Sequence, residues 1–82
     1  MRIYNDSNSP LFIEDRWIKH GDYIDISEHI FDTINIHCNA GSSEITCEYG
    51  KRYIKNYGNL YAEETDILDN NGLKRIVVND KY

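Results

Sequence analysis

Several residue types are scarce in this sequence: its 82 residues include one proline, one tryptophan, one methionine, two cysteines and five glycines. So few prolines and glycines exclude a collagen-like chain or a flexible linker. No apolar run approaches the ~20 residues that a membrane helix needs. The first residues, Met1 to Asp6, lack the apolar stretch of a signal peptide. We therefore expect a cytoplasmic protein without a membrane segment, located in the host cytoplasm if a phage encodes it.

The size and the charge of the chain narrow the possible classes of fold and function further. A chain of this length holds a single domain, residues 1–82, and has no room for a Rossmann unit or a TIM barrel. Fourteen acidic and nine basic residues give a formal charge of -5, which argues against binding nucleic acid or anionic lipid over the whole surface. Ten aromatic residues and twelve isoleucines predict a folded core despite the mean hydropathy of -0.65.

One compositional excess points to ancestry. Isoleucine, asparagine, lysine and tyrosine have AT-rich codons, and together they occupy 33 of the 82 positions. Such a bias is typical of AT-rich genes, as found in many phages, mobile elements and some bacteria. We expect the gene to come from a genome of this kind.

A first antiparallel hairpin is predicted where residues 11–18 pair with 23–26 around a turn at 19–22. This register sets Ile18 opposite Tyr23. A bulge is expected near Glu14 and Asp15, because Asp15 intrudes on an apolar face. Strand alternation then places five side chains in the core: Leu11, Ile13, Trp17, Ile24 and Ile26.

A second hairpin is predicted where residues 34–40 pair with 45–49 around a loop at 41–44. Its apolar face sets Cys38 opposite Cys47 and Ile36 opposite Tyr49, and its polar face sets His37 opposite Glu48. Because nothing marks secretion, we expect the two cysteines to be reduced core thiols, with a strained cross-strand disulfide as the alternative.

The last third of the chain is less regular. Asn70-Asn71-Gly72 is a strong turn signal before a β-branched strand at 73–78, and the acidic stretch 63–69 is compatible with a strand or a short helix. Ser27, followed by Glu28, has the features of a helix N-cap and predicts one short helix at 27–30. The sequence therefore predicts a mostly β fold, either a small antiparallel β-sandwich or a partly open barrel, with five to seven short strands and one short helix.

Motifs of catalysis and metal binding are missing. The sequence contains no GxSxG, Walker or GxGxxG pattern, and no pair of acids is marked by its spacing, so we expect no enzyme. His20, His29 and His37 lie in no HxH or HxxxH arrangement, and there is no CxxC, so we expect neither a metal nor a cofactor.

The stretch 49–61 is the most unusual feature. Tyrosines recur in it every four residues with basic residues between them: Tyr49, Lys51, Arg52, Tyr53, Lys55, Tyr57 and Tyr61. Gly50 and Gly58 oppose a helix, whereas on an extended strand this interval returns to one face and forms a ladder. The ladder is compatible with rings that cap the core, a protein-recognition surface, or a site for nucleotides or single-stranded nucleic acid. A turn at Gly50-Lys51 would break it.

Acidic residues follow this stretch at Glu63, Glu64, Asp66 and Asp69. They predict a solvated face or a patch for a basic partner surface. Our leading hypothesis is a non-enzymatic inhibitor from a phage or mobile element, which uses the stretch 49–61 and these acids to block a larger host defence protein. The alternatives are a nucleotide or single-stranded nucleic-acid binding module that uses 49–61, and a small virion structural or assembly protein. The oligomeric state is left open.

Overall fold

All regular structure in the described part of the chain is β-strand. A computed structural model describes residues 1–27 and 31–81. Its nine strands are β1 (Arg2–Asn5), β2 (Leu11–Ile13), β3 (Arg16–Ile18), β4 (Tyr23–Asp25), β5 (Phe31–Cys38), β6 (Gly41–Glu48), β7 (Lys51–Gly58), β8 (Leu60–Leu68) and β9 (Lys74–Asp80). They form a four-stranded sheet in the order β4-β1-β9-β8 and a five-stranded sheet in the order β3-β2-β5-β6-β7.

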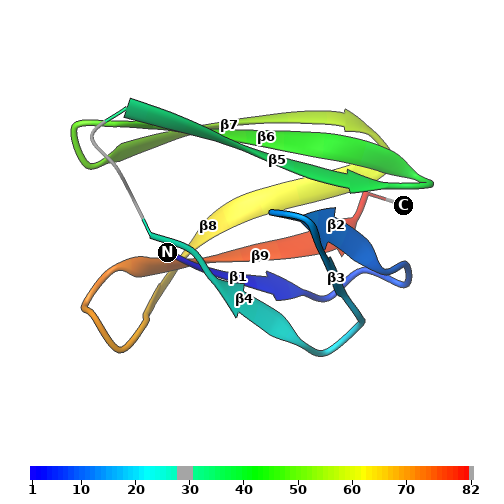
Figure 1. Cartoon of the computed structure of the whole chain (residues 1–82), viewed down its shortest axis with the longest axis horizontal. Helices are drawn as coiled ribbons and strands as arrows, with labels where there is room; N and C mark the ends of the chain where they lie inside the picture. The colour runs from blue at the N-terminus through cyan, green and yellow to red at the C-terminus, as the bar shows by residue number, and fades with distance from the viewer. Residues whose placement is uncertain (28–30, 82) are drawn as a thin grey trace.

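The two sheets form an open sandwich. Strands β5, β6 and β7 lie over β1, β4 and β9 (Figure 1), and the sheets do not join into a barrel. Neighbouring strands are antiparallel except β1 and β9, which are parallel. The predicted mostly β sandwich is therefore confirmed, with more strands than the five to seven expected. Of the predicted helix at 27–30, residues 28–30 lie outside the described residues, and Ser27 is not helical.

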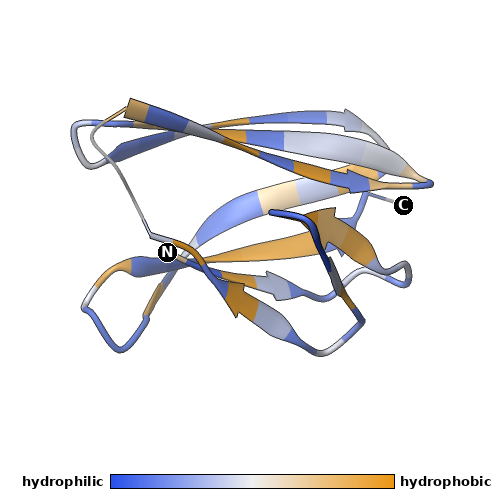
Figure 2. Ribbon diagram, in the orientation of Figure 1, coloured by the Kyte–Doolittle hydropathy of each residue, from blue (hydrophilic) through white to orange (hydrophobic). Residues whose placement is uncertain are grey.

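The core lies between the sheets and consists mainly of isoleucine. Apolar and polar residues alternate along β5 and β6 (Figure 2), so each strand buries one side and exposes the other. The most deeply buried apolar side chains come from both sheets: Ile3, Leu11, Ile13, Ile34, Ile36, Ile45, Leu60, Ile76 and Val78.

The first predicted hairpin is wrong. Strand β2 pairs with β3, through a two-residue turn at Glu14 and Asp15, whose φ angles of 51° and 62° are both left-handed. Two consecutive residues with left-handed φ angles form a two-residue turn whose twist matches that of the flanking strands. The structure therefore has a tight turn at Glu14 and Asp15, where a bulge was expected. Strand β4 pairs instead with β1 in the other sheet. Trp17 consequently lies outside the core with 67% of its surface exposed, whereas Ile24 is buried as predicted.

The second predicted hairpin has the wrong register, and its predicted faces are right except at Tyr49, which is exposed beyond the end of β6, so that Ile36 lies opposite Ser43 instead. Its turn is at 39–40, so Cys38 pairs with Gly41 and Cys47 pairs with Asp32. No disulfide joins the two described cysteines. His37 lies opposite Ser42 and not opposite Glu48. Because the true partners differ from the predicted ones by an even number of residues, Ile34, Ile36, Ile45 and Cys47 are still buried.

The last third agrees better with its prediction. Strands β8 and β9 form a hairpin around the Asn70-Asn71-Gly72 turn, and the acidic stretch belongs to β8. Pairing is irregular between Glu64 and Leu68, after which Leu68 lies opposite Lys74. The stretch 63–69 is thus mainly strand and contains no helix.

Buried Asn5 connects the sheets at one side of the sandwich. Its amide nitrogen donates to the carbonyl oxygens of Ile18 on β3, at 2.7 Å, and of Ser9, at 2.9 Å. Its amide oxygen accepts from the backbone N–H of Ser7, at 2.9 Å, and lies 2.6 Å from the Ser7 hydroxyl. All four hydrogen-bonding positions of the amide are therefore used.

Asn56 connects the sheets at the other side. From β7 its amide oxygen accepts from the backbone N–H of Ala62 on β8, at 2.9 Å, and from the Ser43 hydroxyl, at 2.7 Å. Its amide nitrogen donates to the Ala62 carbonyl oxygen at 3.2 Å. The side chain thus takes the place of a neighbouring strand for Ala62, at an edge where the two sheets meet.

We predict that Asn5→Ala lowers the free energy of unfolding by about 3 kcal/mol, because it leaves several buried donors and acceptors without partners. Denaturant titration followed by far-ultraviolet circular dichroism measures this change. Asn8→Ala is the matched control, since Asn8 is exposed and its hydrogen bond to Asp80 uses only the backbone N–H. Equal stability of the two variants would contradict a structural role for the Asn5 amide.

We also predict that Gly41→Ala destabilises the fold by about 3 kcal/mol through steric overlap. A Cβ atom at Gly41 would lie 2.2 Å from the carbonyl oxygen of Tyr57. Gly50→Ala is the comparison, because Gly50 has a φ of 79° but open space around it, so its cost of about 1 kcal/mol is backbone strain alone. The prediction fails if urea denaturation shows Gly41→Ala to be no less stable than Gly50→Ala.

Candidate functional site

The outward surface of the five-stranded sheet carries a row of side chains that crosses every strand. Trp17 on β3 is opposite Phe12 on β2, which is opposite His37 on β5. His37 is opposite Ser42 on β6, and Ser42 is opposite Tyr57 on β7. The rings of Phe12 and Trp17 pack together with centroids 5.0 Å apart. Residues from segments 11–18 and 31–58 are thereby collected on one surface.

We call this surface the aromatic face. It is defined by five aromatic side chains on its strands, Phe12, Trp17, Phe31, Tyr53 and Tyr57, with Tyr49 at its end in the β6–β7 turn. Phe31 and Tyr49 meet edge to face with centroids 4.7 Å apart. No described element covers the face, and Tyr53 and Tyr57 each expose about half of their surface. An open concentration of large rings is unusual on a monomeric surface and is typical of an interaction site.

The tyrosine ladder is shorter than predicted. Tyr53 and Tyr57 lie on the outward side of β7 together with Lys51 and Lys55, as the alternation requires. Tyr49 and Gly50 form the β6–β7 turn, and Tyr61 belongs to β8 in the other sheet. The ladder therefore has two tyrosines and two lysines.

The lysines of β7 stand beside acids of β6. Glu44 is opposite Lys55, and Glu48 is opposite Lys51. Within residues 1–27 and 31–81, none of these four side chains takes part in an ion pair. The aromatic face thus carries a column of acids next to a column of bases, and all four charges are available to a partner.

Arg52 has a different environment from the two lysines. It lies on the inward side of β7, where its guanidinium is 3.4 Å from the Glu64 carboxylate and donates to the Lys74 carbonyl oxygen. Lys74 in turn is 3.7 Å from Glu64 and 3.8 Å from Asp66. Arg52 of the basic segment therefore pairs with Glu64 of the acidic segment, whereas Lys51 and Lys55 lie on the outward side of β7, so the charges are not divided into one basic and one acidic patch.

The remaining predicted acid, Glu63, lies on the outward side of the four-stranded sheet, opposite Val77. Near Arg52, a groove of about 570 Å³ lies between the β6–β7 turn and the β8–β9 hairpin. Leu68 and Leu73 contribute apolar surface to it. The groove adjoins the aromatic face at Tyr53 and Lys51.

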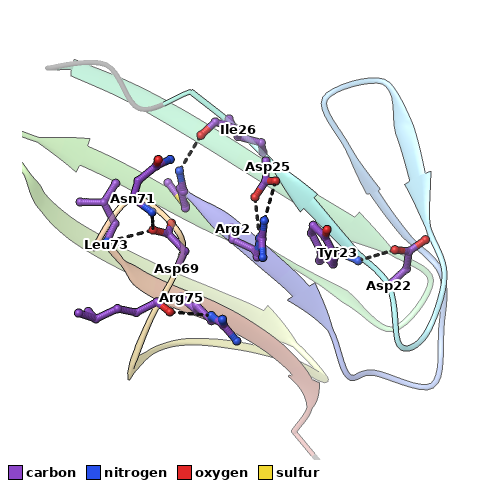
Figure 3. A network of polar contacts seen from close by, with 11 residues as sticks. Arg2, Asp22, Tyr23, Asp25, Ile26, Asp69, Asn71, Leu73 and Arg75 are labelled. Carbon is purple, nitrogen blue, oxygen red and sulfur yellow. Dashed lines mark hydrogen bonds and ion pairs between the residues drawn. The ribbon is translucent and has the colours of Figure 1, made fainter.

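A polar network lies at the other sheet (Figure 3). Arg2 and Asp25 form a bidentate ion pair with N–O distances of 2.8 Å and 3.1 Å, which lowers the pKa of Asp25 and raises that of Arg2. Backbone N–H groups of Leu73, at 3.0 Å, and Asn71, at 2.8 Å, donate to Asp69 and lower its pKa. These contacts hold β1 against β4 and shape the β8–β9 turn, so the network has a structural explanation.

Other kinds of site find no support in the described residues. Residues 1–27 and 31–81 contain no group of three or more histidine, cysteine, aspartate or glutamate side chains placed to hold a metal ion. The same ranges contain no helix long and apolar enough to cross a bilayer. The chain matches no protein-family model, and no curated protein or solved structure is significantly similar to it.

Sequence reasoning missed half of the aromatic face. Trp17 was assigned to the core, and Phe12, Phe31, Glu44 and Glu48 were not singled out as binding residues. One signal was available, because Leu11-Phe12-Ile13 is apolar on both sides of a predicted strand. Such a strand has a second side that needs a partner of its own.

We predict that stability falls as the pH drops below about 4, because Asp25 and Asp69 have lower pKa values in the folded than in the unfolded protein. Their contribution is fully present above the unfolded pKa and is lost as the pH falls through the folded pKa. Asp69→Asn and Asp25→Asn should each reduce the difference between urea midpoints measured at neutral and at acidic pH. If both variants keep the pH dependence of the wild type, neither Asp25 nor Asp69 contributes to the loss of stability in acid.

Proposed function

We propose that this chain is a non-enzymatic protein-recognition domain, encoded by a phage or mobile element, that inhibits a host defence protein by covering part of it with the aromatic face. The observation that carries the proposal is the concentration of five large aromatic side chains on one open sheet surface. Tyrosine and tryptophan provide large, rigid contact area at low entropic cost, and they dominate the energetics of many protein interfaces.

The size of the face supports a protein partner. Three strands of eight residues and two of three residues give a flat area of roughly 480 Å². Its side chains add to this area, which therefore approaches the ~600 Å² that each partner contributes to the smaller protein interfaces. A domain of 82 residues can thus devote one whole side to a single larger partner.

The charges favour a protein over nucleic acid. Single-stranded nucleic acid needs a basic groove that follows its backbone beside the stacking rings. On the aromatic face, Lys51 and Lys55 are each adjacent to an acid of β6, so the face has no continuous positive track. Alternating charges suit a protein surface with a complementary pattern, where they increase specificity and the rate of association.

The assignment to defence inhibition rests on the composition of the chain together with its architecture. The AT-rich residue bias is that of many phages and mobile elements. A small rigid sandwich with one broad face and no recognisable catalytic motif is suited to blocking a larger protein by occupying its surface. These features support an inhibitor that acts by occlusion.

The test is capture of a partner with matched tyrosine variants. Tagged protein is incubated with lysate of the host, and the retained protein is identified and its affinity measured. We expect Tyr57→Ala and Trp17→Ala to weaken binding at least tenfold, as the loss of a central aromatic does at other interfaces. Tyr61→Ala should bind like wild type, because Tyr61 is similarly exposed but belongs to the other sheet.

Two results would contradict the proposal. One is a failure to find capture through the aromatic face, either because no stoichiometric partner is retained or because Tyr57→Ala and Tyr61→Ala affect the affinity of the partner equally. The other is tight, salt-sensitive binding of a labelled single-stranded oligonucleotide that Tyr53→Ala and Lys55→Glu both weaken. The second result would replace the proposal with the nucleic-acid alternative.

A further inference from the structure

The outward side chains of β6 and of the edge strand β7 form two columns that complement each other residue by residue. On β6 the outward side chains are Ser42, Glu44, Thr46 and Glu48, and their partners on β7 are Tyr57, Lys55, Tyr53 and Lys51. Every acid is therefore beside a base, and every small polar side chain is beside a tyrosine. Because none of the four charges is in an ion pair within the described residues, each can pair with an opposite charge on another molecule.

A pattern of this kind is self-complementary under a two-fold rotation. If the axis runs parallel to the strands between β6 and β7, a second copy placed face to face sets its β6 over β7 of the first copy. Glu44 then meets Lys55 and Glu48 meets Lys51, each twice because the interface is isologous. Tyr53 and Tyr57 are placed over the small side chains Thr46 and Ser42, which leaves room for the rings.

The same columns disfavour the other face-to-face arrangement. An axis in the plane of the face but perpendicular to the strands stacks β6 on β6 and β7 on β7. The column that holds the acids then lies over its own copy, and so does the column that holds the lysines, so no glutamate is placed over a lysine. Like charges brought together in an interface cost free energy, so the charge pattern selects the axis parallel to the strands.

The overlap is small, and this determines how strong the association is. The axis lies near one edge of the sheet, so two strands of eight residues overlap, with a flat area of roughly 260 Å² in each copy. Even when side chains are included, this area belongs to the class of weak, transient interfaces. A larger partner that covers all five strands competes successfully with such a contact.

We propose that the aromatic face binds a second copy of this chain, with β6 of each copy over β7 of the other, in a weak dimer that keeps these two strands of the face covered until the partner displaces the second copy. The inference of a dimer rests only on the pattern of outward residues on β6 and β7. Its role as a reversible cover rests on the proposed function.

Exchange of the charges tests the geometry. The variant Glu44→Lys/Glu48→Lys leaves only positive charges in the two columns, and Lys51→Glu/Lys55→Glu leaves only negative ones. Sedimentation velocity at low salt and protein concentrations up to the millimolar range should show dimers of the wild type. Self-association should be at least tenfold weaker for each variant alone. An equimolar mixture of the two variants should recover wild-type association as a heterodimer.

Net charge does not explain recovery in the mixture. Each double substitution changes the formal charge of -5 by four units, so both variants remain negative overall. Circular dichroism and urea denaturation establish that each variant is folded. Glu63→Lys, an exposed acid on β8 in the other sheet, is the control and should dimerise like wild type.

A monomeric wild type under these conditions overturns the inference, as does a mixture that stays monomeric or a folded variant that dimerises like wild type. These experiments use purified protein without a partner, so their failure leaves the proposed function untouched. Conversely, failure to capture a host protein leaves the dimer untouched. The regulatory role requires, in addition, that the captured partner binds the monomer and lowers the fraction of dimer.

Discussion

Two asparagine side chains hold the two sheets together at opposite sides of the sandwich, and the rest of the structure depends on them. The core between the sheets is small and made largely of isoleucine. Its hydrophobic packing stabilises the contact between the sheets but is non-directional, so it does not fix how the sheets are aligned. Asn5 and Asn56 fix the alignment, because each side-chain amide forms directional hydrogen bonds with backbone groups of the opposite sheet. Hydrogen bonds of this kind specify one alignment of the sheets, since any sliding would leave buried polar groups without partners.

This arrangement explains why the aromatic face is open. Every strand of the five-stranded sheet uses its inward side for the core, and no element of the described residues covers the outward side. The outward side must therefore face solvent or a partner. Its lysines and glutamates present charge to the surroundings, and its rings supply contact area. In our proposal a partner and a second copy of the chain both use this one face, with the broader contact replacing the narrower one.

The class of the fold was predictable because strand alternation is a local property. Residues 31–48 show which side chains are buried even in the wrong register, since a shift by an even number of residues leaves the faces unchanged. Pairing was not predictable in the same way. The turn at Glu14 and Asp15 requires two non-glycine residues with left-handed φ angles, which sequence preference disfavours. Missing that turn placed β4 in the wrong sheet and Trp17 in the core.

By itself, the sequence determined that the chain is a β protein with a core of isoleucine, and that Tyr53, Tyr57, Lys51 and Lys55 share one side of a strand. Only the tertiary structure decided that Phe12, Trp17 and Phe31 join them, that Tyr61 does not, and that Arg52 is engaged by Glu64 between the sheets. The physical reason is that alternation along one strand is set by local backbone geometry, whereas the neighbours of a strand are set by long-range pairing. That pairing depends on buried hydrogen bonds from side chains as distant as Asn5 and Asn56.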